Sequence, residues 1–262
     1  MDDSEVYSGR IEKLLRWVGA QLTKYDLVDF MNTKFLKSSV LGISLLVTGC
    51  ASVDPQFADP RDPYESYNRS MYAFNDTLDS AILKPIGKGY NAIVPAPVNR
   101  GITNFFNNLE DLTSAVNNLL QLKVNRAFND VSRVAINSTI GILGFMDVAS
   151  NMDLPRTDED FGQTLGAWGA ESGPYIVLPL LGPSSSRDAV GTVVDWFIDP
   201  IYYIEDDETR LIMRATKVVD KRADLLTASN VVEQAAIDPY AFVRDAYLQR
   251  RQNQVFDGNP PE

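Results

Sequence analysis

The sequence has no histidine and a single cysteine, Cys50, among its 262 residues. Without histidine, a serine or cysteine nucleophile has no ordinary general base at neutral pH. The serines at 184–186 also stand outside the G-x-S-x-G setting of a nucleophile elbow. One cysteine forms no disulfide within a monomer, and a structural zinc site is disfavoured without histidine. We therefore expect neither an enzyme nor a bound cofactor or metal.

Basic residues are scarce relative to acidic ones. The chain has 24 Lys and Arg against 35 Asp and Glu, which gives a formal net charge of −11. Such a chain repels a phosphate backbone, so we expect no nucleic-acid partner. Long stretches of alternating polar and apolar residues are also missing, which predicts little sheet. Hydrophobic residues make up 45% and charged residues 23%, the proportions of a chain that folds around a core.

The single cysteine ends a short apolar run with the layout of an export signal. Two lysines precede an apolar stretch at 40–47, and a pair of small residues separates that stretch from Cys50. The stretch is too short for a spanning helix, which needs roughly 20 residues. The ending VTGC at 47–50 resembles the lipobox of bacterial lipoproteins, whose cysteine is acylated and becomes the first mature residue. We predict a signal peptide at 31–49 and lipid attachment at Cys50; the alternative is a buried or incidental cysteine.

The residues on either side of this signal bear on location and on the start of the chain. An aspartate after the lipidated cysteine tends to retain such lipoproteins at the inner membrane, so Ala51 predicts a lipid anchor in the outer membrane, on its periplasmic side. Residues 1–30 place acidic side chains directly before the basic region of the signal. We interpret 1–30 as an over-extended start, with translation beginning at Met31. The alternative is an amphipathic helix with a role of its own.

The chain after Cys50 is predicted to be all-α. Residues 50–61 have the small, proline-broken composition of a tether, a helical domain is predicted for 62–251, and 252–262 form a short tail. Asp62-Pro63 is expected to begin the first helix, because Asp is a strong N-cap and Pro suits the first helical position. Further helices are expected after the acidic run 158–160, from Ser186 to Asp199-Pro200, over 207–228 and from Asp238-Pro239.

Apolar side chains recur three or four positions apart in these helices, so each helix is amphipathic. The stripes are Tyr64, Tyr67, Met71, Phe74 and Leu78; Val98, Ile102, Phe105, Leu109, Leu112 and Val116; Val124, Phe128, Val131 and Ala135; Val190, Val194 and Phe197; Leu211, Ala215, Val218 and Leu225.

Two apolar segments do not fit an amphipathic helix. Residues 140–146 are apolar on every side and contain two glycines, and residues 173–183 enclose an apolar stretch interrupted by proline. Neither can form a spanning helix. One interpretation is a buried loop that crosses the core, and the other is a segment that enters lipid or lines an apolar passage. The candidate membrane or channel residues are Ile142, Phe145, Tyr175, Ile176, Leu178 and Leu180.

Several stretches together resemble the MlaA family of lipoproteins, also called VacJ. They are DPYESYNR at 62–69, MYAFN at 71–75, RG at 100–101, NF at 104–105, NNLE at 107–110, NSTIG at 137–141, GFMDVA at 144–149, FGQTLG at 161–166, GPYIVLPLLGPSSSRD at 173–188, DPY at 238–240 and VR at 243–244. The resemblance runs from Asp62 to about Arg250. The thirty residues before Met31 and the brief tail depart from the family pattern.

The resemblance implies a ring of amphipathic helices lying in the membrane plane around a central channel. It also implies a function: an outer-membrane lipoprotein that removes mislocalised phospholipids from the outer leaflet and passes them to a soluble periplasmic lipid carrier. The implied partners are phospholipids, the outer membrane and a trimeric porin. Two alternatives remain open, a structural porin-associated lipoprotein without transport and, with less support from the residues, a lipid hydrolase.

Individual polar contacts with a lipid are less defined in the sequence. Arg187 and Asp188 either contact a headgroup or form an ordinary pair in the first turn of a helix. The asparagines at 107, 108, 117 and 118 either line a polar passage or belong to solvated helix faces.

Overall fold

The computed structural model describes residues 59–261, without the side chains of 231–235. The predicted signal peptide, Cys50 and most of the tether therefore lie outside the described residues. The described part is mainly helical, as the sequence predicted, with one short hairpin of two strands. The elements are α4 (Glu65–Leu78), a π-helix (Asp79–Leu83), α5 (Lys84–Ile93), α6 (Ala96–Leu120), α7 (Val124–Thr139), a 3₁₀ turn (Ala149–Met152), α8 (Phe161–Ala167), β1 (Tyr175–Leu178), β2 (Gly182–Ser185), α9 (Ser186–Ile198), a second 3₁₀ turn (Pro200–Tyr203), α10 (Asp207–Asp224), α11 (Leu226–Ala235) and α12 (Pro239–Val255).

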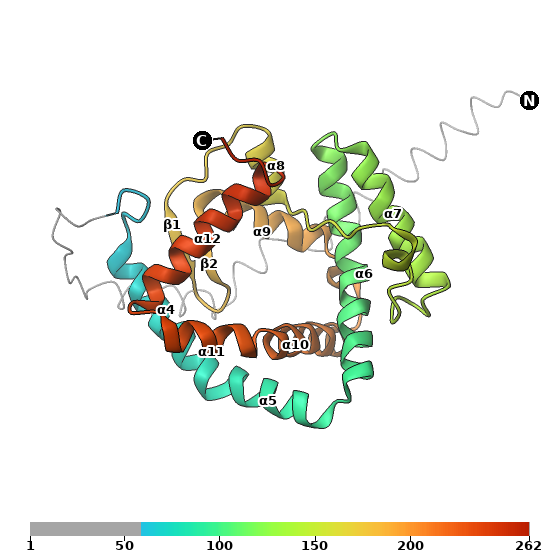
Figure 1. The fold of residues 1–262 in the computed structure, drawn as a ribbon, viewed down its shortest axis with the longest axis horizontal. Coiled ribbons are helices and arrows are strands. Elements are labelled where there is room, and N and C mark those ends of the chain that lie inside the picture. The colour runs from blue at the N-terminus through green and yellow to red at the C-terminus, as the bar shows by residue number, and fades with distance from the viewer. Residues whose placement is uncertain (1–58, 262) are drawn as a thin grey trace, which may run out of the picture. The chain divides into compact units, whose positions relative to one another are not determined.

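The helices pack as neighbouring pairs around a mixed interior. α6 and α7 form an antiparallel hairpin, α5 lies beside α10, and α8 packs against α9 and α12 (Figure 1). Strands β1 and β2 pair antiparallel, with Tyr175 opposite Ser185 and Leu178 opposite Gly182. None of the described helices combines the length and apolar content that a membrane span requires. The arrangement of the helices as a ring around a channel stays a prediction.

Side-chain caps mark most of the predicted helix starts. Asp160 accepts a hydrogen bond from the backbone N–H of Gln163, and Asp238 accepts one from Ala241. The cap of α9 is Ser185, one residue before the predicted Ser186. An accepting oxygen at this position satisfies an N–H group that the helix leaves unpaired. The capping residues in the sequence therefore predicted the starts of these helices to within one residue.

The first helix begins later than the sequence indicated. α4 starts at Glu65, and no side chain caps it. Asp62 is buried, where its carboxylate accepts from Asn68 at 2.7 Å, from the hydroxyl of Tyr240 and from Arg244 at 3.3 Å. The predicted cap was wrong because these distant partners take the carboxylate away from the helix end.

Two other boundaries differ from the prediction. The helix expected over 207–228 is two helices, since α10 ends at Asp224 and α11 begins at Leu226. The tail expected from 252 starts later, because α12 continues to Val255. The side chain of Val255 packs against Gly166 of α8. A Cβ atom added to Gly166 would lie 2.8 Å from the methyl carbons of Val255. The last residue of α12 thus packs against α8.

Candidate functional site

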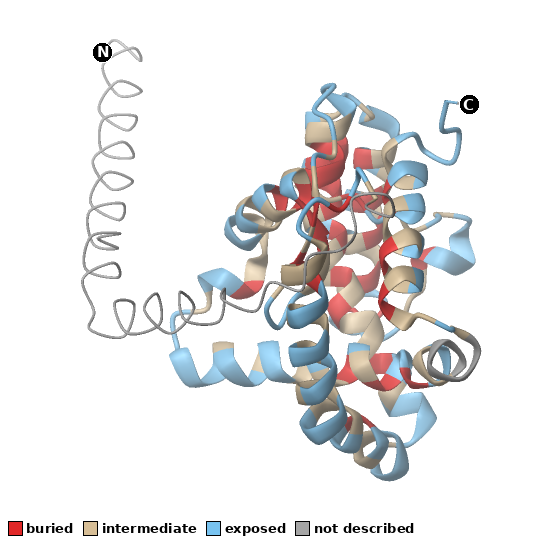
Figure 2. Cartoon of the chain, turned by 90° about the vertical axis from the view of Figure 1, so that its left-hand side faces the viewer, coloured by how far each residue is buried: buried red, intermediate tan, exposed pale blue. Residues whose placement is uncertain are grey.

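Buried positions in the described domain are mostly polar. Among the described side chains, ten apolar ones are buried against 19 polar or charged ones, and the largest fully buried side chain is Arg133. Many large apolar side chains are exposed instead. Figure 2 shows buried residues where helices meet and exposed ones along the outer faces. Because exposed apolar area is unfavourable in water, this distribution favours an outer surface that contacts lipid.

The outer face of α7 shows the arrangement most clearly. Val124, Phe128 and Val131, from the predicted stripe, are all exposed, Phe128 at 73%. The opposite face buries Asp130 and Arg133 against α6. A stripe with this spacing normally packs into the core of a water-soluble protein. Here it points away from the protein, and the polar face packs inside.

The loop after α7 extends this apolar surface. Ile140, Ile142, Leu143, Phe145 and Met146 are exposed, so the loop does not cross the core as a buried segment. Ile142 and Leu143 have φ angles of 53° and 56°, which are strained for non-glycine residues. The turn is closed by a hydrogen bond from the N–H of Met146 to the carbonyl of Gly141 at 2.8 Å. The backbone thus holds two apolar side chains outward at a conformational cost.

In the second apolar segment, residues 173–183, side chains of β1 alternate between buried and partly exposed positions. Tyr175 and Val177 are fully buried with Tyr240 in the small apolar core, whereas Ile176 and Leu178 are half-buried. Leu180, at the turn between the strands, is 69% exposed. Tyr175 therefore has no surface left to contact lipid or line a channel. A membrane or channel role stays a prediction for Ile142, Phe145, Ile176, Leu178 and Leu180.

The guanidinium of Arg133, a residue of α7, connects this helix to α6 and to the loop after α7 through hydrogen bonds and ion pairs. Its Nε donates to Asp111 Oδ2 at 3.0 Å and its Nη2 to Asp147 Oδ1 at 3.1 Å. Arg156 donates to the other oxygen of Asp111 at 2.9 Å. The fully buried carboxylate of Asp111 therefore lies between two guanidinium groups. A buried charge is tolerated when it is paired and hydrogen-bonded in this way.

The asparagines of α6 belong to the same polar interior. Asn117 donates to Asp195 Oδ1 at 3.2 Å and accepts from Thr164 Oγ1 at 2.8 Å. Asn118 donates to Asp130 Oδ2 at 2.8 Å. Both asparagines are fully buried. Neither sequence interpretation, a passage lining or a solvated face, was right for Asn117 and Asn118, because partners on neighbouring elements enclose them.

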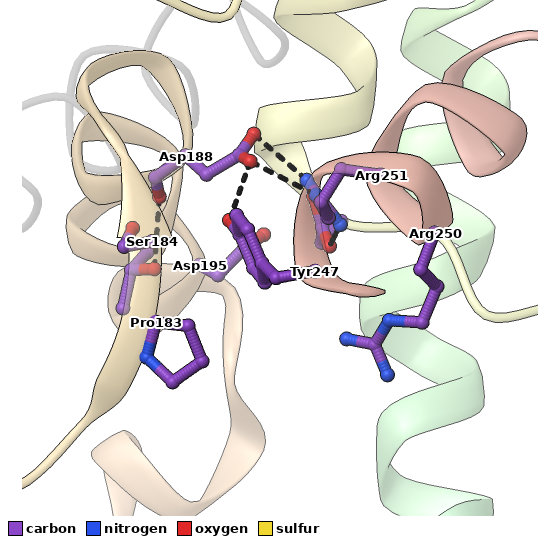
Figure 3. Close-up of a pocket in the computed structure, with 9 residues that line it drawn as sticks. Pro183, Ser184, Asp188, Asp195, Tyr247, Arg250 and Arg251 are labelled. Carbon is purple, nitrogen blue, oxygen red and sulfur yellow. Dashed lines mark hydrogen bonds and ion pairs between the residues drawn. The ribbon is translucent and has the colours of Figure 1, made fainter. Parts of the chain in front are cut away.

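A polar cavity of about 180 Å³ lies between β2, α9 and α12, and Figure 3 shows its lining. Asp188 is at its centre: Arg251 donates to both of its oxygens at 2.9 Å, and the hydroxyl of Tyr247 donates to Oδ2 at 2.6 Å. Burial alone would raise the pKa of Asp188, but Arg251 and Tyr247 hold it at about 2. Arg251 also donates to Asp160 at 2.6 and 2.8 Å. The wall of the cavity is thus a tightly paired charge cluster.

Helix α9 has two chemically different faces. Asp188, Thr192 and Asp195, four and three positions apart, line the cavity. Val190, Val193 and Phe197 lie on the opposite side of the helix and are exposed. A helix of this kind has a polar interior face and an apolar exterior face. Helix α9 therefore offers charged and hydroxyl side chains on one face and apolar side chains on the other.

The two residues that the sequence paired as a headgroup candidate take different positions. Asp188 lines the polar cavity, and Arg187 pairs with it at 3.0 Å. Arg187 also lines a second, larger cavity of about 680 Å³, whose lining includes Gly169, Val255 and Arg251. Arg251 thus stands between the two cavities. Asp195 and Arg251 were not among the site residues predicted from the sequence. The spacing of Asp188, Thr192 and Asp195 opposite an apolar stripe is the pattern that indicates Asp195.

The serines that precede α9 are used structurally. Ser185 Oγ accepts from the N–H of Asp188 at 3.1 Å and caps the helix. The Ser184 hydroxyl, also buried, is 3.3 Å from the carbonyl of Ser185. Since the whole sequence contains no histidine, no imidazole can activate either hydroxyl. The described hydrogen bonds of these serines are therefore internal to the protein.

Among the carboxyl groups that line this cavity, Asp195 is the one whose pKa is raised. Burial raises the pKa of its carboxyl to about 6; the N–H of Phe161 opposes this shift, and the carboxylate of Asp160 adds to it. Since the pKa of Asp195 in the folded protein exceeds the ordinary aspartate value of 3.8, protonation on acidification favours the folded state. Lowering the pH from 7.5 to 5.5 is thus expected to gain about 1 kcal/mol of stability from this group.

The expected pH effect is lost in Asp195→Asn, which has no proton to take up. Thermal unfolding in detergent at both pH values checks this. Carboxyl groups with lowered pKa values would change stability in the opposite direction if they took up protons. Asp188 and Asp59, whose pKa values are about 2, stay ionised between pH 7.5 and pH 5.5. An identical pH dependence in the wild type and in Asp195→Asn would contradict the assignment.

Comparison with known proteins places the chain in a family. Residues 60–254 match the family described as MlaA lipoprotein. The intermembrane phospholipid transport system lipoprotein MlaA of Haemophilus influenzae is 35% identical over 234 residues, which cover 87% of this chain and 93% of that protein. The protein of the same name from Escherichia coli K12 is 36% identical over 219 residues, 82% of this chain and 86% of that protein.

A solved structure gives the same result for the fold. It is described as "Structural basis for maintenance of bacterial outer membrane lipid asymmetry", and its matching chain is 34% identical to this one. The superposition has a TM-score of 0.65 and covers 76% of this chain and 99% of that chain. The similarity therefore includes nearly the whole of the solved chain.

Proposed function

The chain belongs to the MlaA lipoprotein family, and we propose that it is the lipoprotein of an intermembrane phospholipid transport system that maintains the lipid asymmetry of a bacterial outer membrane. The observation that carries the proposal is the inverted distribution of polarity. Apolar side chains are exposed on α7, α9 and the 140–146 loop, while carboxylates, arginines and asparagines are enclosed. A phospholipid needs both environments, an apolar one for its tails and a polar one for its headgroup.

In more detail, the protein removes mislocalised phospholipids from the outer leaflet and passes them to a soluble periplasmic carrier. Acyl chains on Cys50 anchor it on the periplasmic side of the outer membrane, beside a trimeric porin. Ile142, Phe145, Ile176, Leu178 and Leu180 contact lipid tails or the apolar part of the passage. Support for the membrane contact comes from the strained, outward-pointing turn at Ile142 and Leu143.

The transport proceeds without bond breaking. The lipid moves from an unfavourable leaflet to a carrier that binds it, so affinity and a continuous amphipathic route are sufficient. Support comes from the serines before α9, which cap the helix, and from a sequence that contains no histidine. Release of fatty acid from labelled phospholipid by the purified protein would overturn this part of the proposal.

A complementation experiment tests the proposed function. Deletion of the gene is expected to raise the phospholipid content of the outer leaflet, measured by labelling lipids at the cell surface, and the wild-type gene restores it. A structural lipoprotein without transport predicts no rise. Cys50→Ala in the same strain is expected to shift protein from the outer-membrane fraction to the soluble fraction, because acyl chains contribute about 0.8 kcal/mol per buried methylene. Absence of acyl chains from Cys50 in the purified wild-type protein, measured by mass spectrometry, would contradict the anchor.

A further inference from the structure

Two charged groups that line the polar cavity beside α9 take no part in the ion pairs around it. Arg251 neutralises Asp160 and Asp188, and Arg187 also pairs with Asp188. Asp195 and Arg250 line the same cavity. Within residues 59–261, neither of them forms an ion pair, with each other or with another side chain. One negative and one positive group therefore remain available.

We propose that this cavity binds a phosphoethanolamine headgroup, with the ammonium at Asp195 and the phosphate at Arg250. The inference rests on the proposed function and names the headgroup for which the site is selective. A neutral site with one unpaired charge of each sign fits a zwitterion, whose ammonium group can donate to Asp195. An anionic headgroup fits less well, because it brings no cationic donor to the carboxylate of Asp195.

The carboxylate of Asp195 has room for an ammonium group. It accepts from the N–H of Phe161 at 3.0 and 3.1 Å and from Asn117 at 3.2 Å. An ionised carboxylate offers about four acceptor positions, and an ammonium donates three hydrogen bonds. Thr192 and Ser184 line the cavity as well and bring hydroxyl oxygens to it. Several acceptors thus surround the place where the ammonium would bind.

Arg250 supplies the complementary group. Over the described residues 59–261, its guanidinium is held by no hydrogen bond or ion pair, and it is exposed at the cavity. Figure 3 shows its side chain apart from the cluster of Asp188, Tyr247 and Arg251. A guanidinium binds phosphate with two parallel hydrogen bonds, which makes arginine well suited to this role.

The size of the cavity agrees with a headgroup and excludes a whole lipid. Its volume of about 180 Å³ corresponds to about six water molecules at liquid density. The acyl tails must therefore stay outside. Val190, Val193 and Phe197 on the other face of α9 are exposed, so apolar surface is present on the same helix.

Calorimetry on the full lipoprotein in detergent tests the site with three probes. They are dihexanoyl phosphatidylethanolamine, dihexanoyl phosphatidylglycerol and glycerophosphoethanolamine, which has no tails. The wild type is expected to bind the phosphatidylethanolamine about tenfold more tightly than the phosphatidylglycerol. Asp195→Asn removes this preference by weakening phosphatidylethanolamine alone, whereas Arg250→Gln weakens both lipids about equally.

Matched controls separate the site from general effects of charge. Asp153→Asn and Arg214→Gln change exposed residues outside the cavity and are expected to leave both affinities unchanged. Because Arg250 is exposed, Arg250→Gln tests the proposal even if Asp195→Asn disturbs the start of α8. Circular dichroism confirms that each variant is folded.

The outcomes distinguish this inference from the proposed function. Equal binding of both lipids to the wild type overturns the headgroup site and leaves lipid transport intact. A preference that persists in Asp195→Asn overturns it too. Binding of glycerophosphoethanolamine as tight as that of the lipid overturns a membrane lipid as the ligand. If neither lipid binds the wild type, both the site and the proposed function are overturned.

Discussion

Replacing Asp111 with alanine is expected to lower the free energy of unfolding by about 3–5 kcal/mol. The carboxylate is fully buried and accepts from Arg133 and Arg156. Its removal leaves Arg133, itself almost fully buried, with only Asp147 as a charged partner. An uncompensated buried charge costs far more than a lost surface contact. Chemical unfolding in detergent, followed by circular dichroism, measures the change.

The matched control is Asp207→Ala. Asp207 is exposed and pairs with Arg210 one turn away on α10. An exposed pair of this kind contributes less than about 1 kcal/mol. If Asp111→Ala and Asp207→Ala unfold at the same denaturant concentration, the interior pairing around Arg133 does not hold α6 and α7 together as described.

Replacing Phe128 with aspartate is expected to weaken binding to phosphatidylcholine vesicles about 10- to 100-fold. Full burial of a phenylalanine side chain in an apolar medium contributes about 1.5–3 kcal/mol, and tenfold in affinity corresponds to about 1.4 kcal/mol. The measurement uses the chain with Cys50→Ala, so that only the protein surface binds. Stability in detergent is expected to change by less than about 0.5 kcal/mol, because Phe128 is exposed.

Asn125→Asp is the control for added charge on the same helix. Asn125 is also exposed on α7, but its replacement removes no apolar surface. It is expected to leave vesicle binding nearly unchanged. Loss of stability in Phe128→Asp with unaltered vesicle binding would mean that this face packs against protein instead of lipid.

The helices were more predictable from the sequence than the direction in which they face. The spacing of Val124, Phe128 and Val131 identified α7 correctly, because a period of 3.6 residues depends on local geometry. The same spacing does not say whether the stripe faces the core or the surroundings. That depends on the solvent around the protein, and the exposed stripe of α7 shows the outcome.

The polar interior was predictable only in part. Asp188 was named from its sequence context, while Asp195, Arg251 and the Asp111–Arg133 pair were not. These groups come together from segments far apart in the chain: Arg251 and Asp160 are separated by 91 positions. Asp62 shows the converse case, in which a strong local capping signal was overridden by distant partners. Local rules fix helix ends only where tertiary contacts do not compete.

A nitroxide label at position 128 tests the central claim that the apolar outer face lies in lipid. The lipidated protein with Phe128→Cys is labelled and reconstituted into vesicles. The wild type is treated in parallel as the control for unspecific labelling, because the sulfur of its Cys50 carries lipid and is not a free thiol. Asp207→Cys, at an exposed acidic helix start, serves as the aqueous reference. We predict that the label at 128 collides more often with oxygen than with a water-soluble nickel complex, and that the reference shows the reverse. Equal access of nickel to both positions would contradict the claim.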